Sequence, residues 1–169
     1  GITGSYGKTS SKNILNDILN VKYNAFPTPK NFNTPLGLII TINNCKLLGS
    51  TTTTSSYGII YKAGSAAPSD HIVITNNLIE GNYYGIYFYG GNSTSNYGYN
   101  NRIDSNIIRD QYYYGTYFYY AGFSSVSHNQ ISSRMTNTAT SWYGLRFYYC
   151  EADVIEGNII SQQSKAISS

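Results

Sequence analysis

The chain has 169 residues, a formal net charge of +3 and only 11% charged residues. This length favours one domain, and the sparse, scattered Lys and Arg argue against nucleic-acid binding. No stretch approaches the ~20 apolar residues of a transmembrane helix, so we expect no membrane insertion. The 15% aromatic content provides a core that disordered chains lack.

Asn, Ser, Thr, Gly and Tyr, which are weak helix formers, make up more than half of the chain. Two motifs alternate along it, separated by polar or proline-containing loops at 24–35, 50–56, 90–101 and 135–141. The first is a glycine followed by strand-like residues, with Gly at 37, 58, 85, 115 and 144. The second is an apolar residue, two residues, Asn, one residue and a second apolar residue, as in Ile74-x-x-Asn77-x-Ile79.

The central position of the second motif recurs six times. In chain order it holds Asp17, Cys45, Asn77, Asn106, Asn129 and Asn158. Each repeat reads as two or three short strands joined by turns, and such a unit buries its apolar side only by stacking on its neighbours. The sequence therefore predicts an all-β parallel β-helix of about six coils, spaced ~4.8 Å apart.

The recurrent asparagine suits a turn, because its side chain bonds nearby backbone and tolerates left-handed dihedrals. Stacked asparagines also bond one another along the axis. We therefore expect a structural ladder of Asn77, Asn106, Asn129 and Asn158, interrupted at Asp17 and Cys45. Cys45 reads as a small buried residue, three to four coils from Cys150 and too distant for a disulfide.

The N-x-I turns and Tyr-Gly-Ile-Tyr strands resemble the right-handed parallel β-helix repeats of secreted bacterial proteins in the broad pectate-lyase-like superfamily. The resemblance covers roughly residues 10–165 and implies a bacterial extracellular or cell-surface location. That superfamily contains polysaccharide lyases, glycoside hydrolases, epimerases, phage tailspikes and adhesin stalks. We expect residues 1–169 to form a single β-helix domain, a fragment of a longer surface protein whose neighbouring domains or chains cap the coils.

An aromatic surface follows from the glycine-led strands. With Ile86 and Phe88 directed inward, a period of two places Tyr83, Gly85, Tyr87 and Tyr89 outward. Across the coils this predicts a glycine-floored trough with aromatic walls, where Lys62 and Arg146 could meet an acidic group. Aromatic rings with polar tips suit sugars, although tyrosine rows also stabilise any sheet by cross-strand pairing. The predicted ligand-binding residues are Tyr83, Tyr87, Tyr89, Tyr113, Tyr117, Tyr119, Trp142, Arg146 and Tyr148.

Catalytic candidates are few. Asp104 and Glu156 occupy the same repeat position two coils apart, ~9.6 Å by strand spacing, close to the separation of an inverting glycosidase pair. The alternative is that both are solvated turn residues. Glu80 and Arg109 match on adjacent coils and predict a surface ion pair.

Metal and cofactor binding is not expected. His71 and His128 fall at different repeat positions, so a shared metal is not predicted. Glu151 and Asp153 leave a calcium ion as an alternative, but two carboxylates supply too few oxygens by themselves.

These patterns favour a non-catalytic extracellular module, a surface adhesin or stalk that binds carbohydrate along the aromatic face. One alternative is a polysaccharide lyase or glycoside hydrolase that uses Asp104, Glu156 or Arg146. Another is a structural spacer or assembly subunit whose tyrosines pack on a second chain. The expected partners are a glycan and the domains or chains that cap the coils.

Overall fold

The computed structural model describes residues 40–50, 55–63, 70–136, 139 and 141–163. All of them fall within one compact unit, Ile39–Ser169. The described residues form strands and turns and no α-helix, and none of their segments is a helix long and apolar enough to cross a membrane. The single domain expected over residues 1–169 remains a prediction.

The strands fall into one large sheet and a small hairpin. In chain order they are β1 (Thr41–Asn43), β2 (Lys46–Leu48), β3 (Tyr57–Lys62), β4 (Val73–Thr75), β5 (Leu78–Tyr89), β6 (Gly91–Ser93), β7 (Asn96–Tyr97), β8 (Asn101–Asp104), β9 (Ile107–Ser127), β10 (Gln130–Ser133), β11 (Tyr143–Ala152), β12 (Ile155–Glu156) and β13 (Ile159–Ser161).

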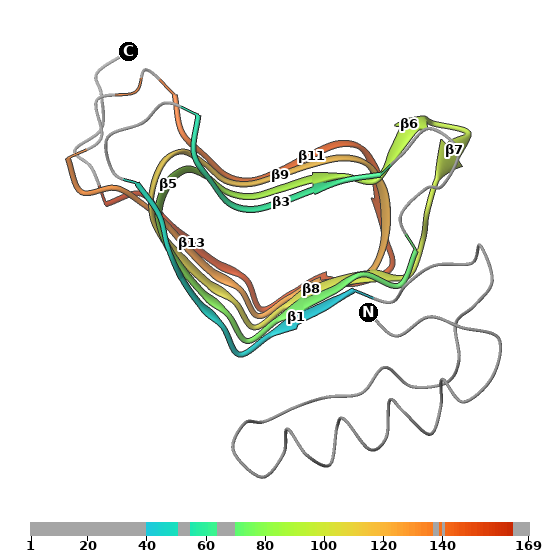
Figure 1. Cartoon of the computed structure of the whole chain (residues 1–169), viewed down its shortest axis with the longest axis horizontal. Helices are drawn as coiled ribbons and strands as arrows, with labels where there is room; N and C mark the ends of the chain where they lie inside the picture. The colour runs from blue at the N-terminus through green and yellow to red at the C-terminus, as the bar shows by residue number, and fades with distance from the viewer. Residues whose placement is uncertain (1–39, 51–54, 64–69, 137–138, 140, 164–169) are drawn as a thin grey trace, which may run out of the picture. The chain divides into compact units, whose positions relative to one another are not determined.

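Every pairing in the large sheet is parallel and joins one coil to the next. β5 lies between β3 and β9, for example, and β9 pairs onward with β11. Successive coils therefore lie over one another when viewed along the stack (Figure 1). This arrangement confirms the right-handed parallel β-helix expected from the repeats.

Five successive coils are described, each marked by one position of the asparagine column: Cys45, Asn77, Asn106, Asn129 and Asn158. The four intervals between these positions make about four full turns, which is fewer than the six coils expected from the sequence. The coil expected around Asp17 lies outside the described residues.

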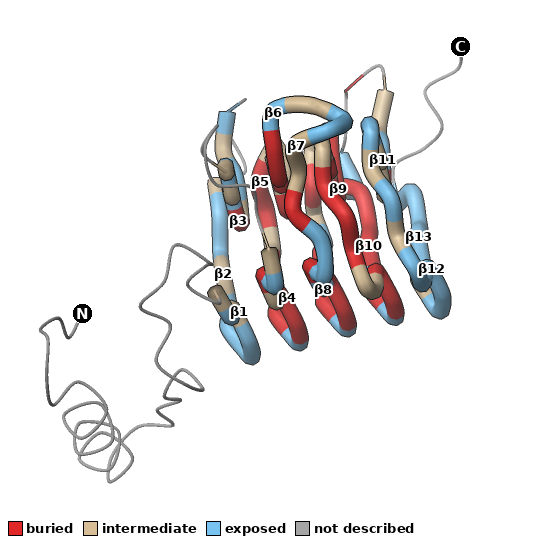
Figure 2. Tube along the Cα trace, turned by 90° about the vertical axis from the view of Figure 1, so that its right-hand side faces the viewer, coloured by how far each residue is buried: buried red, intermediate tan, exposed pale blue. Residues whose placement is uncertain are grey.

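The core consists of columns of apolar residues that repeat from coil to coil. Ile74, Ile103 and Val126 are register partners in one column, and all three are fully buried. Ile79, Ile108 and Ile131 form a second buried column, and Phe88 and Phe118 contribute to a third. Figure 2 shows burial concentrated in the middle coils and exposure at the first and last. Burying each such side chain stabilises the fold by about 1.5–3 kcal/mol.

The coil turns where single residues adopt left-handed backbone dihedrals. The residue directly before each ladder position does so in all five coils: Asn44 (φ 54°), Asn76 (57°), Ser105 (56°), His128 (57°) and Gly157 (62°). The left-handed role expected of the ladder asparagine itself is therefore filled by its predecessor. Asn, Ser, His and Gly at these positions are polar or small, and none is β-branched, a class for which positive φ is a true outlier.

The loop expected at 90–101 contains structure. Gly91–Ser93 and Asn96–Tyr97 pair as the antiparallel hairpin β6–β7, which projects at one corner of the coil (Figure 1). This insertion lengthens its coil without disturbing the register of β5 with β9.

Candidate functional site

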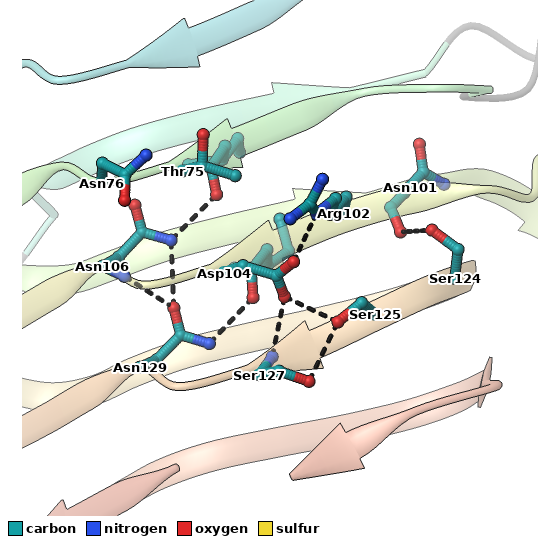
Figure 3. A network of polar contacts seen from close by, with 12 residues as sticks. Thr75, Asn76, Asn101, Arg102, Asp104, Asn106, Ser124, Ser125, Ser127 and Asn129 are labelled. Carbon is teal, nitrogen blue, oxygen red and sulfur yellow. Dashed lines mark hydrogen bonds and ion pairs between the residues drawn. The ribbon is translucent and has the colours of Figure 1, made fainter. Parts of the chain in front are cut away.

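The asparagine ladder is continuous from Asn77 to Asn158. The side-chain Nδ2 of Asn77 donates to Oδ1 of Asn106 (2.9 Å), Asn106 donates to Asn129 (3.0 Å), and Asn129 donates to Asn158 (2.9 Å). Each Oδ1 also accepts the backbone N–H of the preceding asparagine, and each Nδ2 also donates to a backbone carbonyl, as for Asn106 to Ile74 (2.9 Å). Figure 3 shows Asn106 and Asn129 in this arrangement. The expected ladder is therefore a buried structural element.

Among the described residues, Cys45 is the first ladder position on the N-terminal side. Oδ1 of Asn77 accepts the backbone N–H of Cys45 (3.0 Å), while the thiol donates only to the Asn43 carbonyl. Cys45 is exposed, so its prediction as a buried small residue was wrong. The reason is its place in the first described coil, where β1 and β2 pair with the following coil and no other described coil covers them.

Tyrosines form columns along the outer side of β3, β5, β9 and β11. Tyr57, Tyr84, Tyr114 and Tyr143 make one column, with ring centres 4.8, 4.9 and 5.2 Å apart and interplanar angles of 13–16°. Tyr89, Tyr119 and Tyr148 make another, with spacings of 5.2 and 5.1 Å. Between them lie Tyr87 and Tyr117, register partners 5.5 Å apart. We call these three columns, with Lys62 and Arg146, the tyrosine face.

The stacking decides which part of each ring is accessible. In the two outer columns the rings are nearly parallel and repeat at the strand spacing, so each inner ring has its faces covered by its neighbours. Ring edges and hydroxyl groups therefore make up the accessible part of these columns. The sequence predicted flat ring faces that a sugar could contact. The two outer columns instead expose the edges and hydroxyl groups of their rings.

Arg146 lies at the centre of the last coil of this face. Its guanidinium carbon lies 4.8 Å from the ring centre of Tyr143, 5.0 Å from Tyr117, 5.6 Å from Tyr114 and 5.9 Å from Tyr148. It also donates to the Tyr114 hydroxyl (2.8 Å). Cation–π contacts of this kind stabilise by roughly 0.5–2 kcal/mol each, so Arg146 holds three columns together.

Lys62 occupies the opposite end, 5.7 Å from the ring centre of Tyr87. Neither Lys62 nor Arg146 has a carboxylate partner within the described residues. The strand segments of the face, 57–62, 83–89, 113–119 and 143–148, contain these two cations and no Asp or Glu. The tyrosine face is therefore positively charged.

The glycine column is not the floor of an external trough. A side chain at Gly58, Gly85, Gly115 or Gly144 would meet Cγ2 of an inward isoleucine at 2.2–2.4 Å, so these positions point into the core. Ile86, next to Gly85, is also fully buried. Two consecutive inward residues, together with a register shift between Asn82 and Tyr84, break the period of two on which the trough was predicted.

Trp142 also departs from the expected site. It packs against the hydrophobic core cluster, and its ring lies 3.0 Å from where a Gly144 side chain would begin. Its prediction as a residue of the aromatic face was therefore wrong. Tyr83 and Tyr113 stack on each other (5.3 Å, 8°) beside the Tyr84–Tyr114 column, whereas Tyr87, Tyr89, Tyr117, Tyr119, Arg146 and Tyr148 lie in the predicted register.

One full column of the face was missed from the sequence, namely Tyr57, Tyr84, Tyr114 and Tyr143. Each of these tyrosines directly precedes a glycine of the first motif, so the Tyr-Gly dipeptide at 57, 84, 114 and 143 was the available signal. The period of two assigned these residues inward, and the inward glycine that follows each of them reverses that assignment.

Asp104 and Glu156 do share one column, with Ser127 between them. Asp104 is buried, and Oδ1 accepts hydrogen bonds from the Ser125 hydroxyl (2.8 Å) and the Ser127 backbone N–H (2.9 Å), while Oδ2 is paired with Arg102. Figure 3 shows this network. Glu156 is exposed. The Asp104 carboxylate thus has three donors that fix it within the wall of the coil.

The predicted Glu80–Arg109 ion pair is present at 2.6 Å.

Tyrosine ionisation is suppressed on this face. Burial, and then the neighbouring phenols of Tyr57 and Tyr114, raise the pKa of Tyr84 from 10.0 to about 12. Burial is also the first cause of the raised pKa values of Tyr87 and Tyr114. The hydroxyl groups of these three tyrosines therefore remain neutral hydrogen-bond donors at moderately alkaline pH.

Alkaline pH is expected to destabilise the protein as a result. An unfolded chain releases the Tyr84 proton near pH 10 and the folded chain near pH 12, so the unfolded state binds fewer protons in that window. The contribution of Tyr84 to stability is fully present below pH 10 and is lost as pH rises toward 12. Urea midpoints measured across this window test it, and Tyr84→Phe should show a shallower decline. An equal decline in Tyr84→Phe would contradict the assignment of this pH dependence to Tyr84.

The described residues contain no group of three His, Cys, Asp or Glu side chains that could hold a metal ion. Glu151 and Asp153 are both exposed, and Glu151 is hydrogen-bonded to Tyr97, whose pKa is raised by burial and then by Tyr99 and Glu151. The calcium alternative thus gains no further ligand within the part of the chain that the structure describes.

Comparison with known proteins gave one match. A family model described as periplasmic copper-binding protein (NosD) matches residues 30–169. No curated protein and no solved structure matched the chain. The matched range contains every described residue of the β-helix.

Copper in that description can be tested against this donor set. Copper favours thiolate, thioether and imidazole ligands, and this sequence offers Cys45, His71, His128, Met135 and Cys150. All five are described, and the two cysteines and two histidines belong to no group of three that could hold a metal ion, so these residues do not fit a copper site within one chain. The match nevertheless spans most of the sequence and coincides with the β-helix: the chain belongs to the NosD family of periplasmic copper-binding proteins.

Proposed function

We propose that the protein is a non-catalytic binding module, located outside the cytoplasm, that holds an acidic polysaccharide on its tyrosine face. The observation that carries this proposal is the composition of that face: regularly spaced tyrosine hydroxyls together with two cations and no carboxylate. The periplasmic family supports a location in the bacterial envelope, and an adhesin role would use the same surface.

The geometry favours a linear polymer. The columns present the same groups at intervals of 4.8–5.5 Å along the axis, so a chain of repeating sugars could make the same contact several times. Neutral hydroxyls can donate to or accept from sugar oxygens. Lys62 and Arg146 would meet carboxylate groups, because hydrogen bonds between charged partners are shorter and stronger than neutral ones.

Two observations support a non-catalytic role. Asp104 is buried and its carboxylate already accepts from Ser125, Ser127 and Arg102. Glu156, its predicted partner, stands in the last coil beside Ser127, at the end of β9 and outside the segment 113–119 that belongs to the tyrosine face. A catalytic pair would have to act away from the tyrosine face.

Affinity electrophoresis in gels that contain polygalacturonate or neutral dextran tests the proposal. We expect retardation in the acidic gel that weakens about ten-fold in Arg146→Ala, equivalent to ~1.4 kcal/mol. Tyr119→Ala should also weaken it. The matched controls are Arg109→Ala and Tyr99→Ala, exposed residues of the same types outside the tyrosine face, and both should bind as the wild type does.

Each other outcome identifies a different function. Migration of the wild type unchanged in both gels would overturn the proposal and favour a structural spacer. Retardation with release of new reducing or unsaturated ends would indicate a lyase or hydrolase, and Asp104→Asn would then be compared with the wild type. Equal loss in the control variants would show that the tyrosine face is not the binding surface.

A further inference from the structure

Two tyrosines directly after the tyrosine face hold a backbone conformation that bulky residues seldom adopt. Tyr120 has φ 47° and Tyr149 has φ 53°, both in the left-handed region, where a residue with a large side chain is an outlier. Such outliers persist only where the surrounding structure fixes them, and they gather at functional sites. Tyr120 and Tyr149 therefore mark a candidate site of their own.

The left-handed conformation brings two consecutive tyrosines together on one side of the wall. In a regular strand, consecutive side chains point to opposite faces. Here Phe118 and Ala121 are both fully buried, and the two residues between them, Tyr119 and Tyr120, are both partly exposed. Their rings contact each other with centres 4.3 Å apart and planes at 65°. The unusual φ of Tyr120 thus allows both phenols to lie at the surface.

The next coil repeats this arrangement. The ring centres of Tyr148 and Tyr149 lie 4.4 Å apart with planes at 71°. Between the coils, Tyr119 stacks on Tyr148 (5.1 Å, 9°) and Tyr120 stacks on Tyr149 (5.1 Å, 7°). We call these four residues the tyrosine quartet. Its rings therefore form two stacks that meet edge to face.

Hydrogen bonds hold the hydroxyl ends of the quartet together. The side chain of Tyr119 is hydrogen-bonded to that of Tyr120, and the side chain of Tyr149 is hydrogen-bonded to that of Tyr148. The ring carbons ortho to a hydroxyl group are the carbons at which two phenoxyl radicals couple. The quartet thus gathers the reactive ends of four phenols in one place.

The quartet is also open to an oxidant. Tyr148 is 40% exposed and Tyr149 is 53% exposed, and exposed side chains reorient rapidly. In the Tyr84–Tyr114 stack of the tyrosine face, by comparison, Tyr114 is only 8% exposed. Tyr149 is therefore a phenol that a reagent in solution can reach and whose stacked partner lies in the neighbouring coil.

We propose that Tyr120 and Tyr149 form an oxidative cross-linking site, at which hydrogen peroxide activated by a haem peroxidase joins two coils through a dityrosine bond. Each phenol loses one electron and one proton, and the peroxide takes up both electrons and both protons to give two water molecules. The two phenoxyl radicals form one carbon–carbon bond between ortho carbons. The hydrogens of those carbons then move to the oxygens and restore both phenols. The inference does not depend on polysaccharide binding.

Tryptic digestion and mass spectrometry test the site. Cleavage after Lys and Arg places Tyr120 in the peptide 110–134 and Tyr149 in the peptide 147–165. After treatment of the full chain with a haem peroxidase and limiting hydrogen peroxide, we expect these two peptides to be joined with the loss of two hydrogen atoms. The modified chains should remain monomeric on a denaturing gel, and fragmentation should place the bond between Tyr120 and Tyr149.

Phenylalanine variants show whether the bond belongs to this pair. Tyr149→Phe removes the hydroxyl group on which coupling depends and keeps the ring, so the joined peptides should be absent. Tyr143→Phe is the matched control, because Tyr143 is also exposed and stacks on Tyr114 at 5.2 Å, and it should cross-link as the wild type does. Absence of any dityrosine, joined peptides that persist in Tyr149→Phe, or equal loss in Tyr143→Phe would overturn the proposal.

The cross-link should also stabilise the fold, because it closes a loop of about one coil and restricts the unfolded chain. We expect the urea midpoint of the oxidised wild type to rise by about 1 M, and that of Tyr149→Phe to be unchanged by the same treatment. An unchanged midpoint in wild-type chains that carry the bond would contradict the joining of the two coils in their native arrangement.

Discussion

Asn106→Ala is expected to lower the free energy of unfolding by about 4 kcal/mol, because four hydrogen bonds are lost at about 1 kcal/mol each. Its Nδ2 donates to Ile74 and Asn129, and its Oδ1 accepts both donors of Asn77. All four lie in the buried interior, where water cannot replace them. Against a total stability of about 5–15 kcal/mol, this loss is large.

Urea denaturation followed by circular dichroism measures this effect. Asn92→Ala is the matched control, because Asn92 is exposed in the β6–β7 hairpin and accepts one exposed hydrogen bond from Asn96. Its loss should change stability by no more than about 0.5 kcal/mol. Similar destabilisation by the two substitutions would show that the ladder contributes no more than a surface hydrogen bond.

Gly115→Ala is expected to destabilise the protein by about 3 kcal/mol or more, at the upper end of overpacking. The added methyl group would lie 2.2 Å from Cγ2 of Ile131 and 2.4 Å from the Gly144 carbonyl oxygen. The isoleucine is buried in a filled column, and the carbonyl belongs to the next coil, so neither can withdraw without separating the two walls.

Gly122→Ala provides the comparison. There the methyl group would lie 2.5 Å from a ring carbon of Tyr99, which is 51% exposed and can rotate toward solvent. We expect a cost of about 1 kcal/mol or less. Thermal unfolding of the two variants under one condition measures the difference, and equal melting temperatures would contradict the inward assignment of the glycine column.

The repeat pattern predicted the fold because each coil applies the same physical constraint. Ile74, Ile103 and Val126 form one buried column. Each therefore keeps the same sequence spacing from the ladder asparagine that follows it. The ladder was predictable for the same reason, since the amide is the side chain that both donates and accepts along a stack.

The tyrosine face could be predicted only in part. Tyr87, Tyr117 and Arg146 share a column, as expected from alternation after Ile86. Alternation failed on the other side of Gly85, because two consecutive residues point inward there and the register shifts between Asn82 and Tyr84. A pattern of period two cannot indicate such a shift, so it missed the Tyr84 column and placed Trp142 outward.

The fold also has a consequence for how such a protein can evolve. Between Asn77 and Asn106 the chain uses 29 residues, and between Asn106 and Asn129 it uses 23, yet Ile79, Ile108 and Ile131 remain register partners, and the insertion β6–β7 forms a hairpin of its own. Each coil begins and ends at an equivalent ladder position. Deletion or duplication of one whole ladder interval in the gene would therefore bring together residues that already match, and chain length could change by recombination while each remaining column stays intact.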